Sequence, residues 1–418
     1  MSPRPRSRAR DWAKDPDDNQ FQGGARIASM RNRRLNLAAP GWLTFFILAA
    51  TSAWIIPAQA AAHIASSPSE FDAPSGLAFG GGHLWVTNEA GNSVTEVNPS
   101  NGSWVATLRS TRYGFNRPTA ITTSGPDLFI ANAAGSVSEL RASNGALVRV
   151  ISGRHYRFVN PVAIEADGSM ILVLNNGRAG TSGSITKIRK STGSFLRTVS
   201  GSSYAFNNPM ALAVSGPDTF VADKGNNSMT EVTSGGGLVR VVAQQGLSAP
   251  DGIAVQDGNV WVANSASNSA TQIAEGTGAV VTTETDSDGS YGFGLPFTVI
   301  GTSGNIFVAS PFGDSPMVTK LSATSGQPSW YMCNTNGPYY FSLLSAFAVS
   351  SDAGDLWVAS RSDANSKTPG AATGSLTELS TGDGSLITTL PTASTSVPTT
   401  GATTTTSPTS GTTTTTLP

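Results

Sequence analysis

A unit of four short apolar runs recurs seven times between residues 71 and 390, and this repetition restricts the chain to very few architectures. Residues 208–242 form the clearest copy, in which turn sequences such as Gly-Pro-Asp and Gly-Asn-Asn separate the runs. Such spacing predicts a four-stranded antiparallel meander. Repeats of roughly 40–50 residues stack most often as blades around a central axis. The sequence therefore predicts an all-β fold, a seven-bladed β-propeller of four-stranded antiparallel blades.

Within each unit the residue pattern distinguishes the strands. The first strands carry small side chains, which suit positions crowded around an axis. The second strands carry a large apolar residue, as at Trp85 and Trp261, and are apolar on both faces, which predicts burial between neighbouring blades. The first strands are expected to open at Pro74, Pro118, Pro161, Pro209, Pro250, Pro296 and Leu344.

Two polar positions also repeat. The second strand ends on Asn in four units and on Asp223 in another, and turn geometry explains this position better than catalysis by an acid. The third strand places one charged or amide residue between apolar neighbours, as at Glu231 and Lys187. That alternation predicts a strand near the solvent-exposed rim.

The chain outside the repeats divides into two further segments. Basic residues, an apolar run over 37–56 and the sequence Ala58-Gln59-Ala60 predict a signal peptide within an N-terminal extension, 1–60, cleaved after Ala60, with Met30 as a candidate true start. An uncleaved membrane anchor with a basic cytoplasmic tail is the alternative. The domains are then the extension 1–60, the propeller 61–390 and a disordered Thr/Ser/Pro-rich tail 391–418. Either reading places the propeller outside the cytoplasm, secreted or at the cell surface.

Charge is distributed unevenly along the repeats. The stretch from Arg109 to Arg197 holds 12 Lys or Arg and four Asp or Glu, whereas the remaining blades are acidic. An acidic average argues against nucleic acid as a partner. Basic loop residues in this stretch predict a surface, here called the basic arc, for an extracellular polymer or protein ligand, with a carboxylate or phosphate polymer favoured. Solvated loop charges are the alternative. The basic arc comprises Arg112, Arg117, Arg154, His155, Arg157 and Arg178.

The openings Pro-x-Gly-Ile-Ala-Val and the turns Val-Ala-Asp-x-Gly-Asn-Asn resemble the NHL repeat, and the chain is similar to secreted propellers of the virginiamycin B (streptogramin) lyase-like family over about residues 71–390. That family implies elimination across an ester with a His base, an acidic partner and Mg²⁺ in the later blades. The three histidines here are His63, His83 and His155, all before the fourth unit. We therefore predict no catalytic residue.

Cofactor and metal sites are not predicted. Glu284, Asp286 and Asp288 resemble an incomplete calcium loop, and a polar turn is the favoured interpretation. No motif for covalent or zinc catalysis occurs. The sequence thus favours a monomeric recognition module, touching a membrane only through an uncleaved anchor. A metal-dependent lyase or hydrolase in the channel mouth is the rival function.

Overall fold

The computed structural model describes residues 71–178, 182–243, 246–287, 289–311, 316–333, 343–349, 354–361 and 374–390. The chain divides into two units, Met1–Ala60 and Ala61–Pro418, and every described residue belongs to the second. The predicted signal segment and the Thr-rich tail lie outside the described residues. Where the chain is described, no helix is both long and apolar enough to cross a membrane.

The described strands form seven sheets of four strands each, called blades 1 to 7 in chain order. Blade 1 contains β1 (Pro74–Gly80), β2 (His83–Asn88), β3 (Ser93–Asn98) and β4 (Ser103–Leu108). Blade 2 contains β5 (Pro118–Ser124), β6 (Asp127–Asn132), β7 (Ser136–Arg141) and β8 (Leu147–Ser152). Blade 3 contains β9 (Pro161–Asp167), β10 (Met170–Asn175), β11 (Ser184–Arg189) and β12 (Phe195–Val199).

Blade 4 contains β13 (Pro209–Ser215), β14 (Asp218–Asp223), β15 (Ser228–Thr233) and β16 (Leu238–Ala243). Blade 5 contains β17 (Pro250–Gln256), β18 (Asn259–Asn264), β19 (Ser269–Ala274) and β20 (Val280–Thr285). Blade 6 contains β21 (Thr298–Thr302), β22 (Asn305–Ser310), β23 (Met317–Ser322) and β24 (Pro328–Cys333). Blade 7 contains β25 (Leu343–Val349), β26 (Asp355–Arg361), β27 (Gly374–Ser380) and β28 (Leu386–Leu390). Short 3₁₀ turns are η1 (Thr111–Tyr113), η2 (Arg154–Tyr156), η3 (Ser202–Tyr204) and η4 (Lys224–Asn226).

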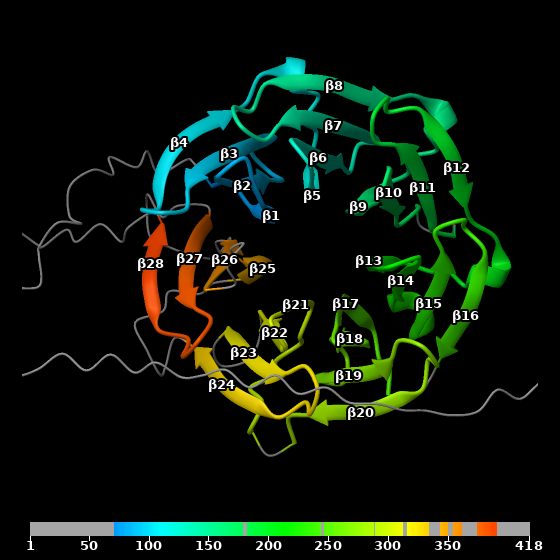
Figure 1. Cartoon of the computed structure of the whole chain (residues 1–418), viewed down its shortest axis with the longest axis vertical. Helices are drawn as coiled ribbons and strands as arrows, with labels where there is room; N and C mark the ends of the chain where they lie inside the picture. The colour runs from blue at the N-terminus through cyan, green and yellow to red at the C-terminus, as the bar shows by residue number, and fades with distance from the viewer. Residues whose placement is uncertain are drawn as a thin grey trace, which may run out of the picture. The chain divides into compact units, whose positions relative to one another are not determined.

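The blades are arranged as a closed ring, with the first strands around a central opening and the fourth strands at the outer edge (Figure 1). Each sheet pairs only strands that are consecutive in the chain, and every pairing is antiparallel in the register of a meander. The predicted seven-bladed propeller is confirmed. Blade 7 closes against blade 1 without an exchanged strand, with Arg361 Nε donating to Pro74 O at 3.2 Å.

The hydrophobic core consists of a layer between each pair of neighbouring blades. Trp85, Trp261 and Trp357 on the second strands are at most 1% exposed. Trp85 packs with Leu128 and Ile130 of the next blade, and Trp261 packs with Ile306 and Val308 in the same way. This placement explains why the second strands are apolar on both faces.

Small residues on the first strands permit close approach of neighbouring backbones at the axis. A Cβ added to Gly252 on β17 would lie 2.7 Å from the Cα of Thr298 on β21. The Cβ of a residue at Gly76 on β1 would lie 3.2 Å from the Cα of Ala120 on β5. Larger side chains at these positions would push the blades apart, which accounts for the Gly and Ala of the repeat.

In blades 1 to 5 the polar residue that ends the second strand joins elements far apart in the unit. In blade 2, the Oδ1 atom of Asn132 accepts the N–H of Asn116 at 3.2 Å, 16 residues earlier. Asn132 Nδ2 donates to Ser138 Oγ at 3.1 Å, and that hydroxyl donates to Tyr113 O at 2.6 Å. The position is structural, as predicted, but it fixes the connection between blades rather than a local turn.

The polar residue of the third strand is buried in six blades and partly buried in blade 6, in contrast to the predicted rim position. Lys187 on β11 is 0% exposed, and its ammonium donates to Ser234 O of blade 4 at 2.8 Å. Gln272 and Lys320 likewise donate to Ala323 O and Thr381 O in the following blades, at 3.0 and 2.8 Å. Burial lowers the pKa of Lys187 and of Lys320. These side chains act as links from one blade to the next.

Candidate functional site

The basic arc is built on connections that carry a repeated aromatic pair. In the Tyr-x-Phe-x-x-Pro segments the two rings stack, with centroids 5.2 Å apart for Tyr113 and Phe115 and 5.3 Å for Tyr156 and Phe158. Tyr156 also donates its hydroxyl to Gly193 O at 2.8 Å. The stacked pairs pack between blades, and they anchor η1 and η2 at the outer edge of the ring (Figure 1).

Three members of the basic arc come together on η2, between blades 2 and 3. Arg154 and His155 lie on the turn itself, and Arg157 follows it with φ of 56°. All three are exposed. Among the described residues, no carboxylate forms an ion pair with Arg154 or Arg157. The ring of His155 lies 4.0 Å from that of Tyr156. This turn presents two guanidinium groups to solvent beside an aromatic surface.

Arg117 occupies a different position, at the inner end of its connection. It has φ of 52° immediately before Pro118, and its N–H donates to Asn92 Oδ1 at 2.7 Å. Its Nη2 atom lies 2.7 Å from Glu89 Oε1, while Arg361 Nη2 lies 2.7 Å from Glu89 Oε2. Burial alone would raise the pKa of Glu89, but the hydrogen bonds from both guanidinium groups outweigh it and lower that pKa. The cluster carries two positive charges on one carboxylate.

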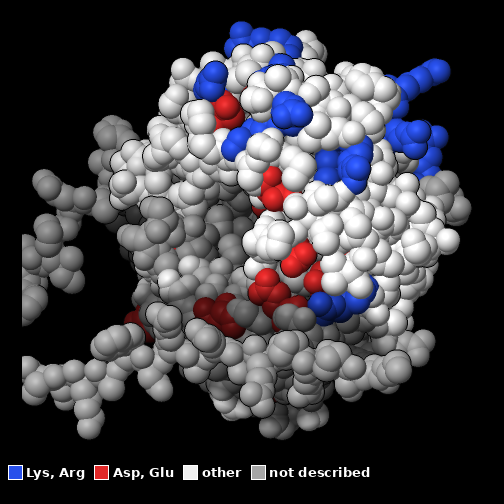
Figure 2. Space-filling view, turned by 45° about the vertical axis from the view of Figure 1, so that its right-hand side comes forward, with Lys and Arg blue, Asp and Glu red and all other residues white. Residues whose placement is uncertain are grey.

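Arg112 and Arg178 stand on separate connections. Arg112 lies on η1, donates to the Tyr113 hydroxyl at 2.7 Å and stacks over that ring, with its Cζ atom 4.7 Å from the centroid. Arg178 is exposed in the loop after β10. In Figure 2, Lys and Arg side chains gather over the upper part of the view, where blades 2 and 3 lie, and Asp and Glu lie mainly lower, toward the central opening. The structure thus distributes the predicted residues over several neighbouring connections.

The central channel is the second candidate site. It has a volume of about 1180 Å³ and is lined by the first strands of all seven blades. Most lining side chains are apolar, and the charged lining residues are Glu165, Lys224, Asp251 and Arg361. Large apolar cavities with a few polar groups are the usual form of small-ligand sites.

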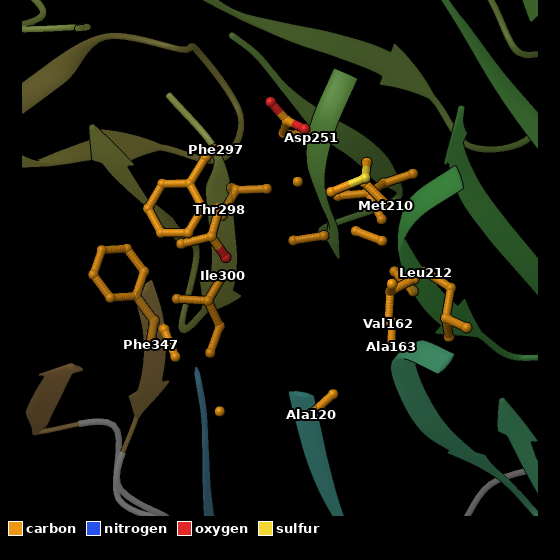
Figure 3. Close-up of a pocket in the computed structure, with 18 of the residues that line it drawn as sticks. Ala120, Val162, Ala163, Met210, Leu212, Asp251, Phe297, Thr298, Ile300 and Phe347 are labelled. Atoms are coloured by element: carbon orange, nitrogen blue, oxygen red, sulfur yellow. The ribbon is translucent and has the colours of Figure 1, made fainter. Parts of the chain in front are cut away.

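The channel mouth is asymmetric because the residue after the opening Pro or Leu differs between blades. Blades 1, 2 and 7 have Ser75, Thr119 and Ser345 there, and these hydroxyls donate to backbone carbonyls such as Pro118 O, at 2.7 Å from Ser75. Blades 3, 4 and 6 have Val162, Met210 and Phe297, which face the channel. Figure 3 shows Met210 and Val162 on one side of the opening, Phe297 on the other, and Asp251 between them.

Two carboxyl groups of the channel differ in their surroundings. Asp251 on β17 is held by the ammonium of Lys224, with N–O distances of 2.7 and 2.8 Å. Glu165 on β9 accepts a hydrogen bond from the Thr122 hydroxyl at 3.2 Å. Enclosure by protein raises the pKa of Glu165 to about 7, although the hydrogen bonds from Thr122 and from the N–H of Ala166 oppose this shift. Glu165 therefore titrates near neutral pH.

The carboxylates of the incomplete calcium loop are engaged with the protein. Glu284 accepts hydrogen bonds from Thr282 and from the Tyr291 hydroxyl. Asp286 Oδ1 accepts the N–H groups of Tyr291 and Gly292 at 2.9 and 3.0 Å. Asp288 lies outside the described residues. Across the described part of the chain, no group of three or more His, Cys, Asp or Glu side chains is arranged to hold a metal ion.

Sequence reasoning missed the residues that line the channel. The signal was present, because the position after each strand-opening Pro or Leu is Ser or Thr in three units and Val, Met, Asp or Phe in the others. Variation at one position of an otherwise regular repeat marks where the copies differ in surface chemistry. The pairing of Glu89 with Arg361, 272 residues away, has no such local signal.

No protein-family model matches the chain, and no curated protein matches it in sequence. Similar solved structures include the computationally designed Ika8 protein, with 14% identity, a TM-score of 0.54 and coverage of 78% of this chain and 88% of that one. They also include BamB from Moraxella catarrhalis, with 15% identity, a TM-score of 0.46 and coverage of 73% and 83%. At such identities the likeness concerns the fold alone.

Proposed function

We propose that this propeller is a recognition module outside the cell, secreted or held at the surface, that binds an anionic polymer through the basic arc. The observation that carries the proposal is the exposed pair Arg154 and Arg157 on η2, which no described carboxylate neutralises. Guanidinium groups bind carboxylates and phosphates through paired hydrogen bonds. A polymer crossing the junction of blades 2 and 3 would reach both.

Several features of the fold support recognition rather than bond cleavage. The NHL-like motifs support kinship with the streptogramin-lyase-like propellers, in a form without their chemistry, because the chain has no His after His155. The predicted signal peptide supports export, and the Thr-rich tail supports attachment at a distance from the surface. A propeller presents a rigid face on which loops vary, and this arrangement suits binding.

Charge reversal tests the proposal. The double variant Arg112→Glu and Arg154→Glu is expected to lose retention on immobilised polygalacturonate and polyphosphate, because it replaces two attractive contacts by repulsive ones. Retention of the unaltered protein is expected to fall steeply as salt rises from low to physiological concentration. The measurement is the salt concentration that elutes each protein.

A matched control separates the site from net charge. Arg141 and Arg189 end the third strands β7 and β11 and do not belong to the basic arc. Reversing these two to Glu changes the net charge by the same amount, and this variant is expected to retain most of its binding. Equal losses in both variants, or retention that salt does not alter, would contradict the proposal.

A further inference from the structure

Glu165 is a carboxylic acid that faces the central channel without a cationic partner. Its contacts are the Thr122 hydroxyl and the N–H of Ala166, both neutral. No ion pair to Glu165 is formed by the described residues. The side chain is enclosed by protein but keeps partial exposure, and it lines the cavity. A molecule inside the channel can therefore reach its oxygens.

The strands packed around β9 provide almost no charge. β5, β10 and β13 contain no titratable side chain. On β6 the one acid, Asp127, is paired with Arg141 at 2.6 Å. Asp167 at the end of β9 lies near Lys187. The cavity around Glu165 is otherwise formed by apolar side chains such as Ile164 and Leu212.

The other charged residues of the channel already have partners. Lys224 holds Asp251, and Arg361 holds Glu89. Lys224 and Asp251 neutralise each other, whereas Arg361 shares the Glu89 carboxylate with Arg117. Among the described residues, Glu165 is thus the one acidic residue of the channel lining without a cationic partner.

The distance from Glu165 to the channel mouth sets the size of such a ligand. Glu165 lies three residues beyond Val162 on the same strand, which corresponds to about 10 Å along β9. Val162 and Met210 line one side of that mouth, and Phe297 lines the other. A chain of about this length that starts at Glu165 would reach these apolar side chains.

We propose that the central channel binds a primary ammonium ion carried on an apolar chain, with the ammonium on the Glu165 carboxylate and the chain directed toward Val162, Met210 and Phe297. The ammonium supplies the positive charge that the protein lacks there, and a charge-assisted hydrogen bond is stronger when water is excluded. The apolar chain gains by leaving water for the channel wall. This site is independent of the basic arc.

The n-octylammonium ion matches the charge and the length, and it serves as the probe. We expect saturable binding to the full-length protein in calorimetry at pH 7.5. Glu165→Gln keeps the shape of the side chain and removes its charge, and it is expected to weaken binding by about tenfold or more. Because binding requires the carboxylate, the affinity of the unaltered protein should rise from pH 6 to pH 8, and Glu165→Gln should show no such rise.

Three comparisons make the assignment specific. Uncharged n-octanol is expected to bind the unaltered protein and Glu165→Gln equally. Asp251→Asn, at the mouth, is expected to change n-octylammonium affinity less than threefold. This change is well below the loss expected when one charge-assisted hydrogen bond is removed. The double variant Arg112→Glu and Arg154→Glu should retain octylammonium binding, whatever happens to its polymer binding.

Several outcomes would overturn the proposal. These are no saturable binding at millimolar n-octylammonium, an unchanged affinity in Glu165→Gln, or a loss confined to Asp251→Asn. Should Glu165→Gln fail to fold, the pH dependence of the unaltered protein decides, and a flat affinity between pH 6 and pH 8 rejects the site.

Discussion

Replacing Trp261 by alanine is expected to lower the free energy of unfolding by about 3–5 kcal/mol, the range for truncating a buried aromatic side chain. Trp261 is 0% exposed and lies in the layer between blades 5 and 6 with Ile306, Val308 and Leu321. Its Nε1 atom donates to Ala323 O of blade 6 at 3.2 Å. The variant therefore loses apolar contacts and a link between blades together.

Denaturant titration followed by circular dichroism measures this effect. Trp104→Ala provides the matched control, because Trp104 lies on the outer strand β4 and is 46% exposed. The same truncation there is expected to cost less than about 1 kcal/mol, as at most exposed positions. Similar losses for the two variants would mean that the second strands do not form the layers between blades.

Asp223→Asn is expected to stabilise the protein by on the order of a few kcal/mol at pH 8, with the gain disappearing below about pH 4. Asp223 ends β14 and is 0% exposed, at the position where four other blades have Asn. Burial raises the pKa of Asp223 to about 8, although hydrogen bonds from Thr230 and from the N–H of Asn207 oppose the shift. The folded protein therefore keeps this acid protonated at neutral pH.

The direction of the effect follows from proton binding. Between about pH 4 and pH 8 the unfolded chain has released the Asp223 proton and the folded chain still holds it. The folded state then binds more protons, so stability falls as pH rises through this window, by about 1.4 kcal/mol per pH unit for one fully linked group. Asparagine carries no such proton and supplies an N–H donor for the Thr230 hydroxyl.

The reciprocal change gives the control. Asn264 Nδ2 donates to Thr271 Oγ1 at 2.9 Å, in the same arrangement as Asp223 and Thr230, 2.8 Å apart. Asn264→Asp is expected to destabilise the protein, and increasingly so as pH rises from 4 to 8. Unfolding free energies at several pH values measure both variants. If Asp223→Asn gave the same gain at pH 4 as at pH 8, an ionisable buried acid would not be the cause.

Much of the fold could be predicted because its determinants are local. Each strand signal lies within a few residues: the Pro that opens a unit, the apolar pairs of β2 or β18, and the Gly of the hairpins. The recurrence of these signals indicates a ring of blades. What could not be predicted depends on the neighbouring blade. The sequence of its own strand predicts that Lys187 is a charged residue near the solvent-exposed rim. Only the arrangement of the blades shows that its ammonium donates a hydrogen bond to Ser234 O.

The same distinction applies to the candidate sites. Arg112, Arg154 and Arg157 could be placed on connections between units because the Tyr-x-Phe-x-x-Pro segment marks those connections. Their positions in the structure agree with that, whereas their role as ligand contacts stays a prediction. Glu165 could not be singled out, because its significance lies in the absence of charge on β5, β10 and β13, which lie beside it only in the folded ring.

Ring closure without an exchanged strand has a consequence for how this chain can be rearranged. Each blade is made from one uninterrupted stretch, and the hairpin of blade 1 at Gly102 faces Leu390 at the end of β28. No blade depends on both termini. Joining the start of β1 to the end of β28 with a linker, and opening the chain in the connection between β12 and β13, would preserve every strand pairing. Circular permutants cut between any two neighbouring blades should therefore form the same propeller.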